Sequence, residues 1–389
     1  MSLSISYRSR VSSIDWLRGL IMMIMALDHC REYLHANAFF SNPLDLEHPS
    51  YLLFFTRWVT HFCAPNFVFL AGISAYLSGL KKTTRQHRWF LFTRGLWLIF
   101  LELTVITFGL WFDIHFSFIT LQVIWAIGIS LLLLSALLGL PSYAILLLGV
   151  LIIAGHNLLD TIAPTEGSLL WISHQPGSLP IGSGRFLLNL YPFLAWTGIL
   201  LTGYGVGALF RPQVSSAERK QWLASLGLGA LLLFLIIRWI NHYGDPSPWQ
   251  SYSSFGITFL SFINTSKYPP SLLYTLMTLG PTLLALSLLE GRNTGYFSWI
   301  EVYGKVPLFY YVLHFYLIHG LSVLLHLYQG ISWENLNFQN GSAGVTPHVG
   351  LPIWRVYLVW LTVLAFLYPL CKAYGAFKKR QRHRLWSYL

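Results

Sequence analysis

The first residues in the chain that could perform chemistry are the ionisable side chains between Asp28 and Glu32, and Asp28, His29 and Glu32 are candidate catalytic residues. Neighbouring residues on a helix point about 100° apart, so Asp28 is badly placed to orient His29. Glu32 lies three residues beyond His29 and shares its helical face, so the Glu32 carboxylate can orient the imidazole. A histidine held in this way is a candidate general base or acyl carrier for transfer to a hydroxyl or an amine. The alternative is an ionic cluster that only marks the end of a helix.

Residues 305–326 hold the second set of candidate groups. Tyr310 and Tyr311 precede His314 by four and three residues, so both phenols share its helical face. His319 follows five residues later, about 140° around the helix, so a metal site that uses both histidines of this helix is disfavoured. His314 is therefore either a catalytic candidate, with Tyr310 beside the substrate, or a packed histidine that hydrogen-bonds a tyrosine.

A third polar segment begins at Arg57 and contains His61 and Asn66. Pro65 cannot donate a backbone hydrogen bond, so it leaves one carbonyl of the preceding turn free. The side-chain amide of Asn66 lies at the same depth. We predict that His61 is a further catalytic candidate and that Arg57 and Asn66 bind substrate in one polar cavity that opens outward. The alternative is a set of unrelated hydrogen bonds between helices.

The elements that carry these residues must lie in a membrane. Hydrophobic residues make up 55% of the 389-residue chain and charged residues only 10%, whereas a soluble domain carries roughly 25% charged side chains. The net charge of +11 does not indicate a nucleic-acid partner, because Lys and Arg interrupt apolar runs as loops do. The three cysteines have no metal-binding or redox spacing. A polytopic protein of the lipid bilayer is the class that remains.

Apolar windows of about 19 residues, long enough to cross the hydrocarbon layer, predict the fold class. We expect an all-α bundle of about ten transmembrane helices that forms a single domain over residues 1–389. A tight hairpin around Pro141 joins the fourth and fifth helices. The predicted spans are 14–34, 57–80, 89–110, 118–139, 142–158, 187–210, 222–241, 271–290, 305–327 and 352–373.

The distribution of Lys and Arg predicts the orientation, since cytoplasmic loops are rich in cations. With the N-terminus inside, the inner segments hold most of the 25 cations, including the cluster at 81–88, and both termini are cytoplasmic. The outer loops are long, and long loops tend to carry function. His48 and Lys267 are among their polar residues. These outer loops lie near 35–56, 159–186, 242–270 and 328–351.

Several longer motifs resemble one family of membrane proteins. The chain reads SIDWLRGL at 13–20 and LDH at 27–29, then FFTRW at 54–58 and THFCAP at 60–65. Later it reads YPFLAWTG at 191–198, FINTSKYPPS at 262–271 and GKVPLFYY at 304–311. Together these segments resemble bacterial membrane proteins related to heparan-α-glucosaminide N-acetyltransferase, and the resemblance extends over nearly the whole chain.

The resemblance implies a transmembrane acyltransferase of a bacterial cytoplasmic membrane. It would take an acetyl group from cytoplasmic acetyl-CoA and place it on an acceptor, often a sugar or glycan, on the far side. Acetyl-CoA is then a co-substrate, neither a metal nor a haem is expected, and a homodimer is favoured. The cationic inner rim, with Arg18 and Lys305, would hold the nucleotide phosphates. Asn66 or Lys267 would stabilise the oxyanion.

The resemblance does not select one catalytic histidine. In the lysosomal relative the active histidine lies in the first lumenal loop, so His35 or His48 matches it as well as His29 does. Other classes also remain open. A secondary transporter would use buried His, Glu and Asp along its path, although Pro65 and Pro192 do not fall in matched halves of the chain. A bis-histidine haem protein would need ligands that face each other across helices.

Overall fold

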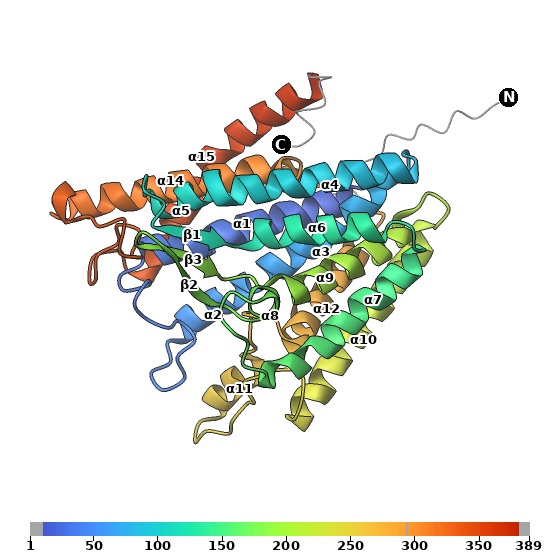
Figure 1. Ribbon diagram of the computed structural model, residues 1–389, viewed down its shortest axis with the longest axis horizontal. Helices are drawn as coiled ribbons and strands as arrows, with labels where there is room; N and C mark the ends of the chain where they lie inside the picture. Colours follow the sequence, from blue (N-terminus) through green and yellow to red (C-terminus); the bar gives the residue numbers. More distant parts are fainter. Residues whose placement is uncertain (1–10, 293–294, 381–389) are drawn as a thin grey trace.

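The computed structural model describes residues 11–292 and 295–380, and most of them are helical (Figure 1). The remaining residues, which include Arg8, Arg10, Arg382 and Arg384, lie outside the described part. The predicted cytoplasmic position of the two termini therefore stays a prediction, as does the orientation of the chain in the membrane.

The long helices coincide with the predicted spans, although several boundaries differ. Two spans are interrupted helices, because α2 gives way to α3 at His61 and η1 is a π-helical turn after α4. The long helices are α1 (Ser12–Leu34), α3 (Cys63–Gly79), α4 (Thr84–Leu101), α6 (Val123–Leu137), α7 (Ser142–Gly155), α9 (Phe193–Val206), α10 (Ser216–Ile240), α12 (Leu272–Leu289), α14 (Pro307–Tyr328) and α15 (Ile353–Arg380).

Shorter elements connect these helices. The short α-helices are α2 (Tyr51–Thr60), α5 (Thr107–Trp111), α8 (Leu169–His174), α11 (Phe255–Ile263) and α13 (Ile300–Gly304). Single turns of π- or 3₁₀-helix are η1 (Glu102–Ile106), η2 (His156–Thr161), η3 (Gly207–Phe210), η4 (Gly295–Phe297) and η5 (Trp333–Asn335). The strands are β1 (Phe118–Leu121), β2 (Gly177–Gly182) and β3 (Arg185–Asn189).

The number of membrane-spanning helices is smaller than the predicted ten by the criterion of length and apolarity. Within the described residues, eight helical segments are long and apolar enough to cross a bilayer, and one of them joins α2 and α3 across the interruption at His61. The two remaining long helices are α1, which carries charged residues at both ends, and α6, which has only 15 residues. The chain is therefore an integral membrane protein, and α1 is a helix of its bundle with an apolar middle and charged ends.

A small sheet corrects the all-α prediction. Strand β1 pairs in parallel with β3, and β2 pairs antiparallel to β3. Residues 118–121 were expected to be the start of a helix, but their apolar run Phe-Ile-Thr-Leu pairs with residues 186–189 instead. Thr120 also accepts a hydrogen bond of 2.7 Å from the indole of Trp111, which fixes the strand against the preceding helix. Aromatic and β-branched residues favour such pairing.

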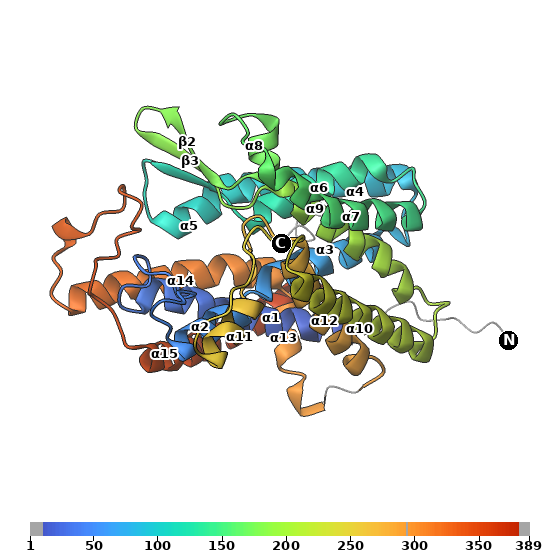
Figure 2. The ribbon, with the colours of Figure 1, turned by 90° about the horizontal axis from the view of Figure 1, so that it is seen from below.

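Helix α1 lies at the centre of the bundle and contacts α3, α13, α14 and α15 (Figure 2). Glycines allow its close approach to α13. A Cβ on Gly19 would lie 2.0 Å from the carbonyl oxygen of Ile300, and one on Gly304 would lie 1.8 Å from that of Asp15. The two backbones therefore touch at a place where no larger residue fits.

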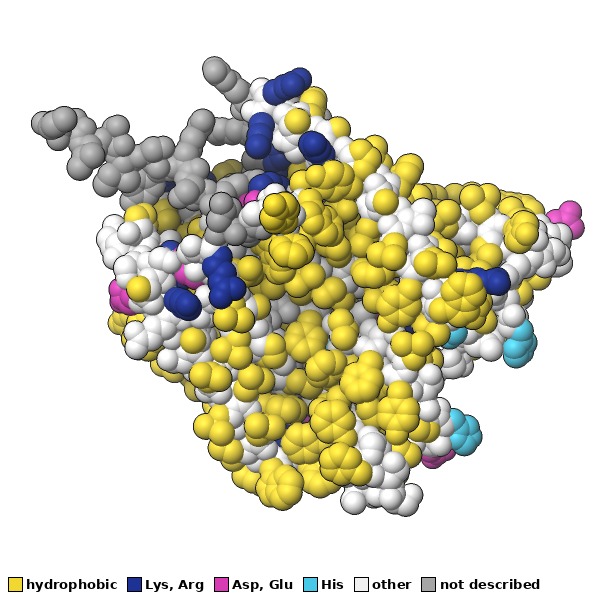
Figure 3. Space-filling model, turned by 180° about the vertical axis from the view of Figure 1, so that it is seen from behind, with side chains coloured by type: hydrophobic (Ala, Val, Ile, Leu, Met, Phe, Trp, Pro, Cys, Tyr) yellow, Lys and Arg dark blue, Asp and Glu magenta, His cyan; other side chains and the backbone are white. Residues whose placement is uncertain are grey.

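The bundle has two chemically different ends. The loop end carries the sheet, α2, α8 and α11, and the cationic end carries the α3–α4 and α9–α10 connections (Figure 1). Figure 3 shows hydrophobic side chains across the broad face, with most Lys and Arg side chains gathered beside the grey segments and histidines on the opposite side. An apolar belt between polar ends is typical of a protein that spans a bilayer.

Candidate active site

Asp28 forms the centre of a buried ion cluster that joins α1 to α2. One of its carboxylate oxygens accepts a hydrogen bond of 3.1 Å from Arg31, and the other contacts Arg57. The Asp28 side chain is only 10% exposed. Two guanidinium groups thus bind this carboxylate, and the carboxylate holds Arg57 in place. Asp28, which was predicted to be catalytic, therefore also positions Arg57.

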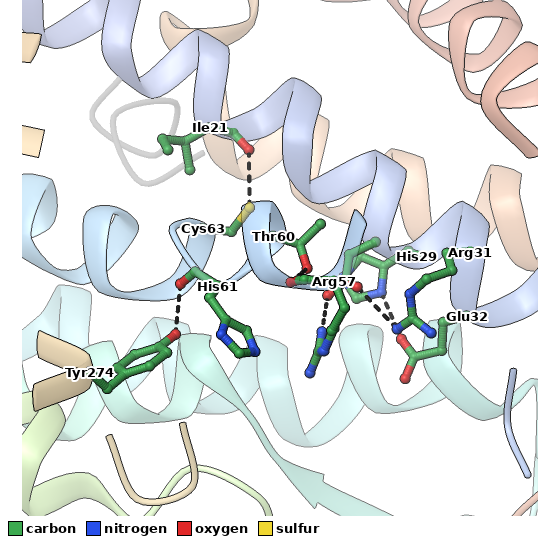
Figure 4. Close-up of polar contacts among 10 residues, drawn as sticks. Ile21, His29, Arg31, Glu32, Arg57, Thr60, His61, Cys63 and Tyr274 are labelled. Atoms are coloured by element: carbon green, nitrogen blue, oxygen red, sulfur yellow. Dashed lines mark hydrogen bonds and ion pairs between the residues drawn. The ribbon is translucent and has the colours of Figure 1, made fainter. Parts of the chain in front are cut away.

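His29 and Glu32 are paired as the helical spacing predicts. The Nδ1 atom of His29 lies 3.2 Å from the Glu32 carboxylate, and their side chains are 14% and 43% exposed (Figure 4). A carboxylate accepts, so the pairing assigns the proton to Nδ1 and leaves the lone pair of Nε2 free for chemistry. The pair therefore has the arrangement of an oriented general base.

His314 lies beside His29, with the two ring centroids 5.3 Å apart. It is fully buried on α14, and its Nδ1 lies 3.1 Å from the backbone carbonyl of Tyr310. The predicted hydrogen bond to a tyrosine is therefore to the main chain and not to a phenol. Within residues 11–292 and 295–380, neither His314 Nε2 nor the Tyr310 hydroxyl has a hydrogen-bond partner. Two buried polar atoms are thus left for a ligand or a reacting group.

His61 and Asn66 lie at the interruption between α2 and α3. Pro65 lacks the N–H that would pair with the His61 carbonyl, and this carbonyl accepts a hydrogen bond of 2.6 Å from Tyr274 instead (Figure 4). The Asn66 amide nitrogen donates to the Phe62 carbonyl at 2.7 Å. Among the described residues, His61 Nδ1 and the Asn66 side-chain oxygen have no partner. Asn66 therefore uses one of its two amide N–H groups inside the helix and keeps the other for the predicted role as oxyanion donor.

A cavity of about 370 Å³ opens at the loop end beside these residues. Glu32, Arg57, His61 and Lys267 all line it, as does Tyr268. Burial opposes ionisation of the Tyr268 phenol, yet the charges of Lys267 and Arg57 hold its pKa below the ordinary value. The cavity therefore has a positive electrostatic potential on the side of Lys267.

A larger cavity of about 940 Å³ opens at the cationic end. Three elements hold Arg18 at its wall, because this side chain donates to Asp15 at 3.1 Å, to the Gly304 carbonyl at 3.2 Å and to Ser74 at 2.8 Å. Lys305 lines the same cavity and pairs with Glu301 at 2.7 Å. The cations in the wall are Arg18, Lys81, Lys82, Arg94, Arg211, Arg219, Lys305 and Lys378.

The histidine pair lies between the two cavities. Phe67 lines the cationic cavity, and its ring stacks on Tyr311 with centroids 6.2 Å apart. Tyr311 contacts His314, with 5.6 Å between ring centroids, and His314 contacts His29. Glu32, which pairs with His29, lines the loop-end cavity. A continuous line of side chains therefore joins one cavity to the other.

Two predicted histidines lie away from this line. His48 is exposed in the connection between α1 and α2, and it is not among the described residues that line either cavity. His35 is half-buried and contacts the Leu351 carbonyl at 2.9 Å. The structure thus brings together His29, His314 and Glu32 without His48. Sequence reasoning missed Tyr311 and Arg94 as site residues and used the 81–88 cations for orientation only.

A comparison with known protein families finds one family that matches this chain. The family described as heparan-alpha-glucosaminide N-acetyltransferase, catalytic, matches residues 10–238. The matched part contains the His29–Glu32 pair, the ion cluster around Asp28 and most cations of the larger cavity. No curated protein matches the chain. The match covers more than half of the chain and confirms the resemblance read from the motifs.

Proposed function

The chain belongs to the heparan-alpha-glucosaminide N-acetyltransferase catalytic family, and from this premise we propose that it moves an acetyl group across the membrane. The family indicates a transmembrane acetyltransferase. The donor is acetyl-CoA at the cationic end, and the acceptor is a sugar or glycan at the loop end. His29, oriented by Glu32, is the general base.

The cationic cavity supports the choice of donor. Among the described residues, its wall carries the eight Lys and Arg side chains named above and one acidic side chain, Asp15. Coenzyme A is a polyanion with a slender apolar arm, so the cations suit its phosphates. The inner lining is apolar, with Phe67, Leu98 and Ile124, and suits the arm. An arm in this lining would carry the thioester toward Tyr311 and His314.

The histidine pair supports the transfer step. His29 Nε2 would take the proton of the acceptor hydroxyl or amine while that atom attacks the thioester carbonyl carbon. The carbon–sulfur bond then breaks, and the CoA thiolate receives the proton from the imidazolium, which gives acetylated acceptor and free CoA. The unpaired Tyr310 hydroxyl is the nearby group that could donate to the oxyanion. The Tyr310 carbonyl holds the ring proton of His314 at Nδ1, so His314 Nε2 is an acceptor.

The loop-end cavity supports a small polar acceptor. A volume of about 370 Å³ is at the lower end of the range of ligand pockets and suits one or two sugar rings. Arg57 and Lys267 can hydrogen-bond hydroxyl or acidic groups, and Glu32 can bind an ammonium or a hydroxyl. The name of the family refers to a glucosaminide, so a saccharide with terminal glucosamine is the first acceptor to test.

The observation that carries the proposal is the His29–His314 pair between two cavities at opposite ends. The test supplies radiolabelled acetyl-CoA to inverted membrane vesicles and follows label on a glucosamine-terminated saccharide and on endogenous glycans and lipids. His29→Ala should lower transfer by about 10²–10⁴ while acetyl-CoA binding is retained. His48→Ala, an exposed histidine, is the matched control and should transfer normally.

Two outcomes would change the assignment. Normal turnover in His29→Ala together with loss of turnover in His314→Ala would move the base to His314. Binding of acetyl-CoA without transfer to any acceptor would favour a secondary transporter, because two cavities joined by polar groups are also what a transport path requires.

A further inference from the structure

A second cluster of ionisable residues lies at the loop end, apart from the histidine pair. His156 and Asp160 are on η2, directly after α7, and His174 is the last residue of α8. Their potential ligand atoms all lie within 4.8 Å of one another. His174 Nε2 is 2.8 Å from Asp160, and the rings of His156 and His174 have centroids 5.5 Å apart. None of the three is among the residues lining either cavity described above.

The buried imidazoles of this cluster lack the partners that buried polar groups normally have. His156 is 3% exposed and His174 is 5% exposed. The Pro270 carbonyl lies near the His156 ring, yet neither nitrogen of this ring has a hydrogen-bond partner in the part of the chain that the structure describes. His174 Nδ1 also has no hydrogen-bond partner among the described residues. The unpaired His156 ring thus lies at such depth beside the His174 Nε2–Asp160 pair, with ligand atoms of all three residues within 4.8 Å, and this points to a ligand that they share.

We propose that His156, Asp160 and His174 bind a Zn²⁺ ion. Two imidazoles and one carboxylate are ligands that zinc accepts, whereas Mg²⁺ and Ca²⁺ prefer oxygen ligands alone. Tetrahedral zinc with bonds of about 2.0–2.1 Å separates its ligand atoms by roughly 3.3 Å. The Asp160–His174 distance of 2.8 Å is already close to this value. The other ligand atoms lie within 4.8 Å of one another, so no separation must shorten by more than about 1.5 Å, a shift that side-chain rotation can supply.

A residue next to the three proposed ligands hydrogen-bonds to one of them and fixes its orientation, as is common around metal sites. Asn157 donates to the second carboxylate oxygen of Asp160 at 2.8 Å, which fixes the direction of that carboxylate. The Asn157 side-chain oxygen accepts from the backbone N–H of Leu272 at 3.0 Å. The ion would therefore tie α7 and α8 to the start of α12.

The position of the site gives the ion a structural role. Residues 264–272 carry Lys267 into the loop-end cavity. This segment is anchored by Asp245, which accepts from Ser266 N–H at 2.8 Å and from Ser271 Oγ at 2.6 Å. The zinc cluster adds a second anchor through Asn157. Zinc binding is thus expected to stabilise the loop end without entering the transfer reaction.

The test uses the full chain, purified without a histidine tag and stripped with chelator. Zn²⁺ is titrated by calorimetry, and bound metal is counted by mass spectrometry after desalting. We expect one Zn²⁺ per chain, a rise in Tm on zinc addition, and visible ligand-field absorption of tetrahedral symmetry when Co²⁺ replaces Zn²⁺. His156→Gln and His174→Gln should each weaken binding at least 100-fold. The exposed His242→Gln is the matched control and should bind as the parent does.

Three results would overturn the proposal. They are absence of a bound metal in the stripped and reloaded parent, equal zinc affinity in the parent and in His156→Gln, and a Co²⁺ spectrum of octahedral symmetry. Asp160→Asn provides a second variant if the histidine variants do not fold, because it keeps the shape of the side chain and the hydrogen bond to Asn157. It should lower zinc affinity at least tenfold, and unchanged affinity would count against the site.

Discussion

Replacing Arg18 with Gln should weaken the binding of coenzyme A. Arg18 is held at the wall of the cationic cavity by Asp15, Ser74 and the Gly304 carbonyl, so its charge is fixed before any ligand arrives. A hydrogen bond to a charged group contributes about 1.5–3 kcal/mol. Loss of one such contact with a phosphate raises Kd about 10- to 100-fold. Glutamine can still bond Ser74, so the local packing should survive.

Isothermal titration calorimetry with CoA in detergent measures the effect. The difference between parent and Arg18→Gln should shrink when salt rises from 0.1 to 1 M, because the screening length falls from about 10 Å to about 3 Å. Lys305→Gln should act in the same direction. Arg355→Gln at the loop end, where the guanidinium lies over Trp354, is the control for loss of a cation elsewhere. Unchanged affinity in both Arg18→Gln and Lys305→Gln would refute the assignment of the phosphate site.

Three further predictions concern packing, charge and orientation. Gly304→Ala should lower Tm and weaken CoA binding, since its Cβ would lie 1.8 Å from the Asp15 carbonyl oxygen and overpacking costs about 1–3 kcal/mol; a parent-like Tm would contradict the contact between α1 and α13. Lys267→Met should raise the pKa of Tyr268, because it removes a cation that favours the phenolate. A difference ultraviolet titration against Tyr268→Phe measures this pKa, and an unmoved pKa would exclude Lys267 as the cause. Single cysteines placed at residues 81–88 should react with membrane-impermeant maleimide in inverted vesicles and not in intact cells, and the reverse pattern would invert the predicted orientation.

The part of the site that depends on one helix could be predicted from the sequence. The His29–Glu32 pair follows from a spacing of three residues, which fixes neighbours on any helix. The free carbonyl before Pro65 follows from the missing N–H of proline. The contact between His29 and His314 could not be predicted, because it depends on how α1 docks against α14. That docking is set by side-chain packing across the whole bundle.

The features that the sequence did not predict have similar physical causes. Residues 118–121 form an apolar run directly before an apolar helix, and such a run has no periodicity that separates strand from helix. Asn66, the predicted oxyanion donor, also gives one amide N–H to the Phe62 carbonyl, a local acceptor that the sequence did not single out. The proposed zinc ligands His156, Asp160 and His174 have spacings of four and fourteen residues, which match no metal-binding motif. Only the folded connection from α7 to α8 brings these three residues together.

The most direct test of the account is the sidedness of acetyl transfer. The protein is reconstituted in one orientation, checked by labelling of a cysteine at residues 81–88, with a glucosamine-terminated saccharide on the side of the loop end. Labelled acetyl-CoA is then added on one side or the other. We predict labelled saccharide only when acetyl-CoA is on the side of the cationic cavity, with loss of this label in His29→Ala. Equal labelling from either side, or transfer only with both substrates at the loop end, would contradict the account.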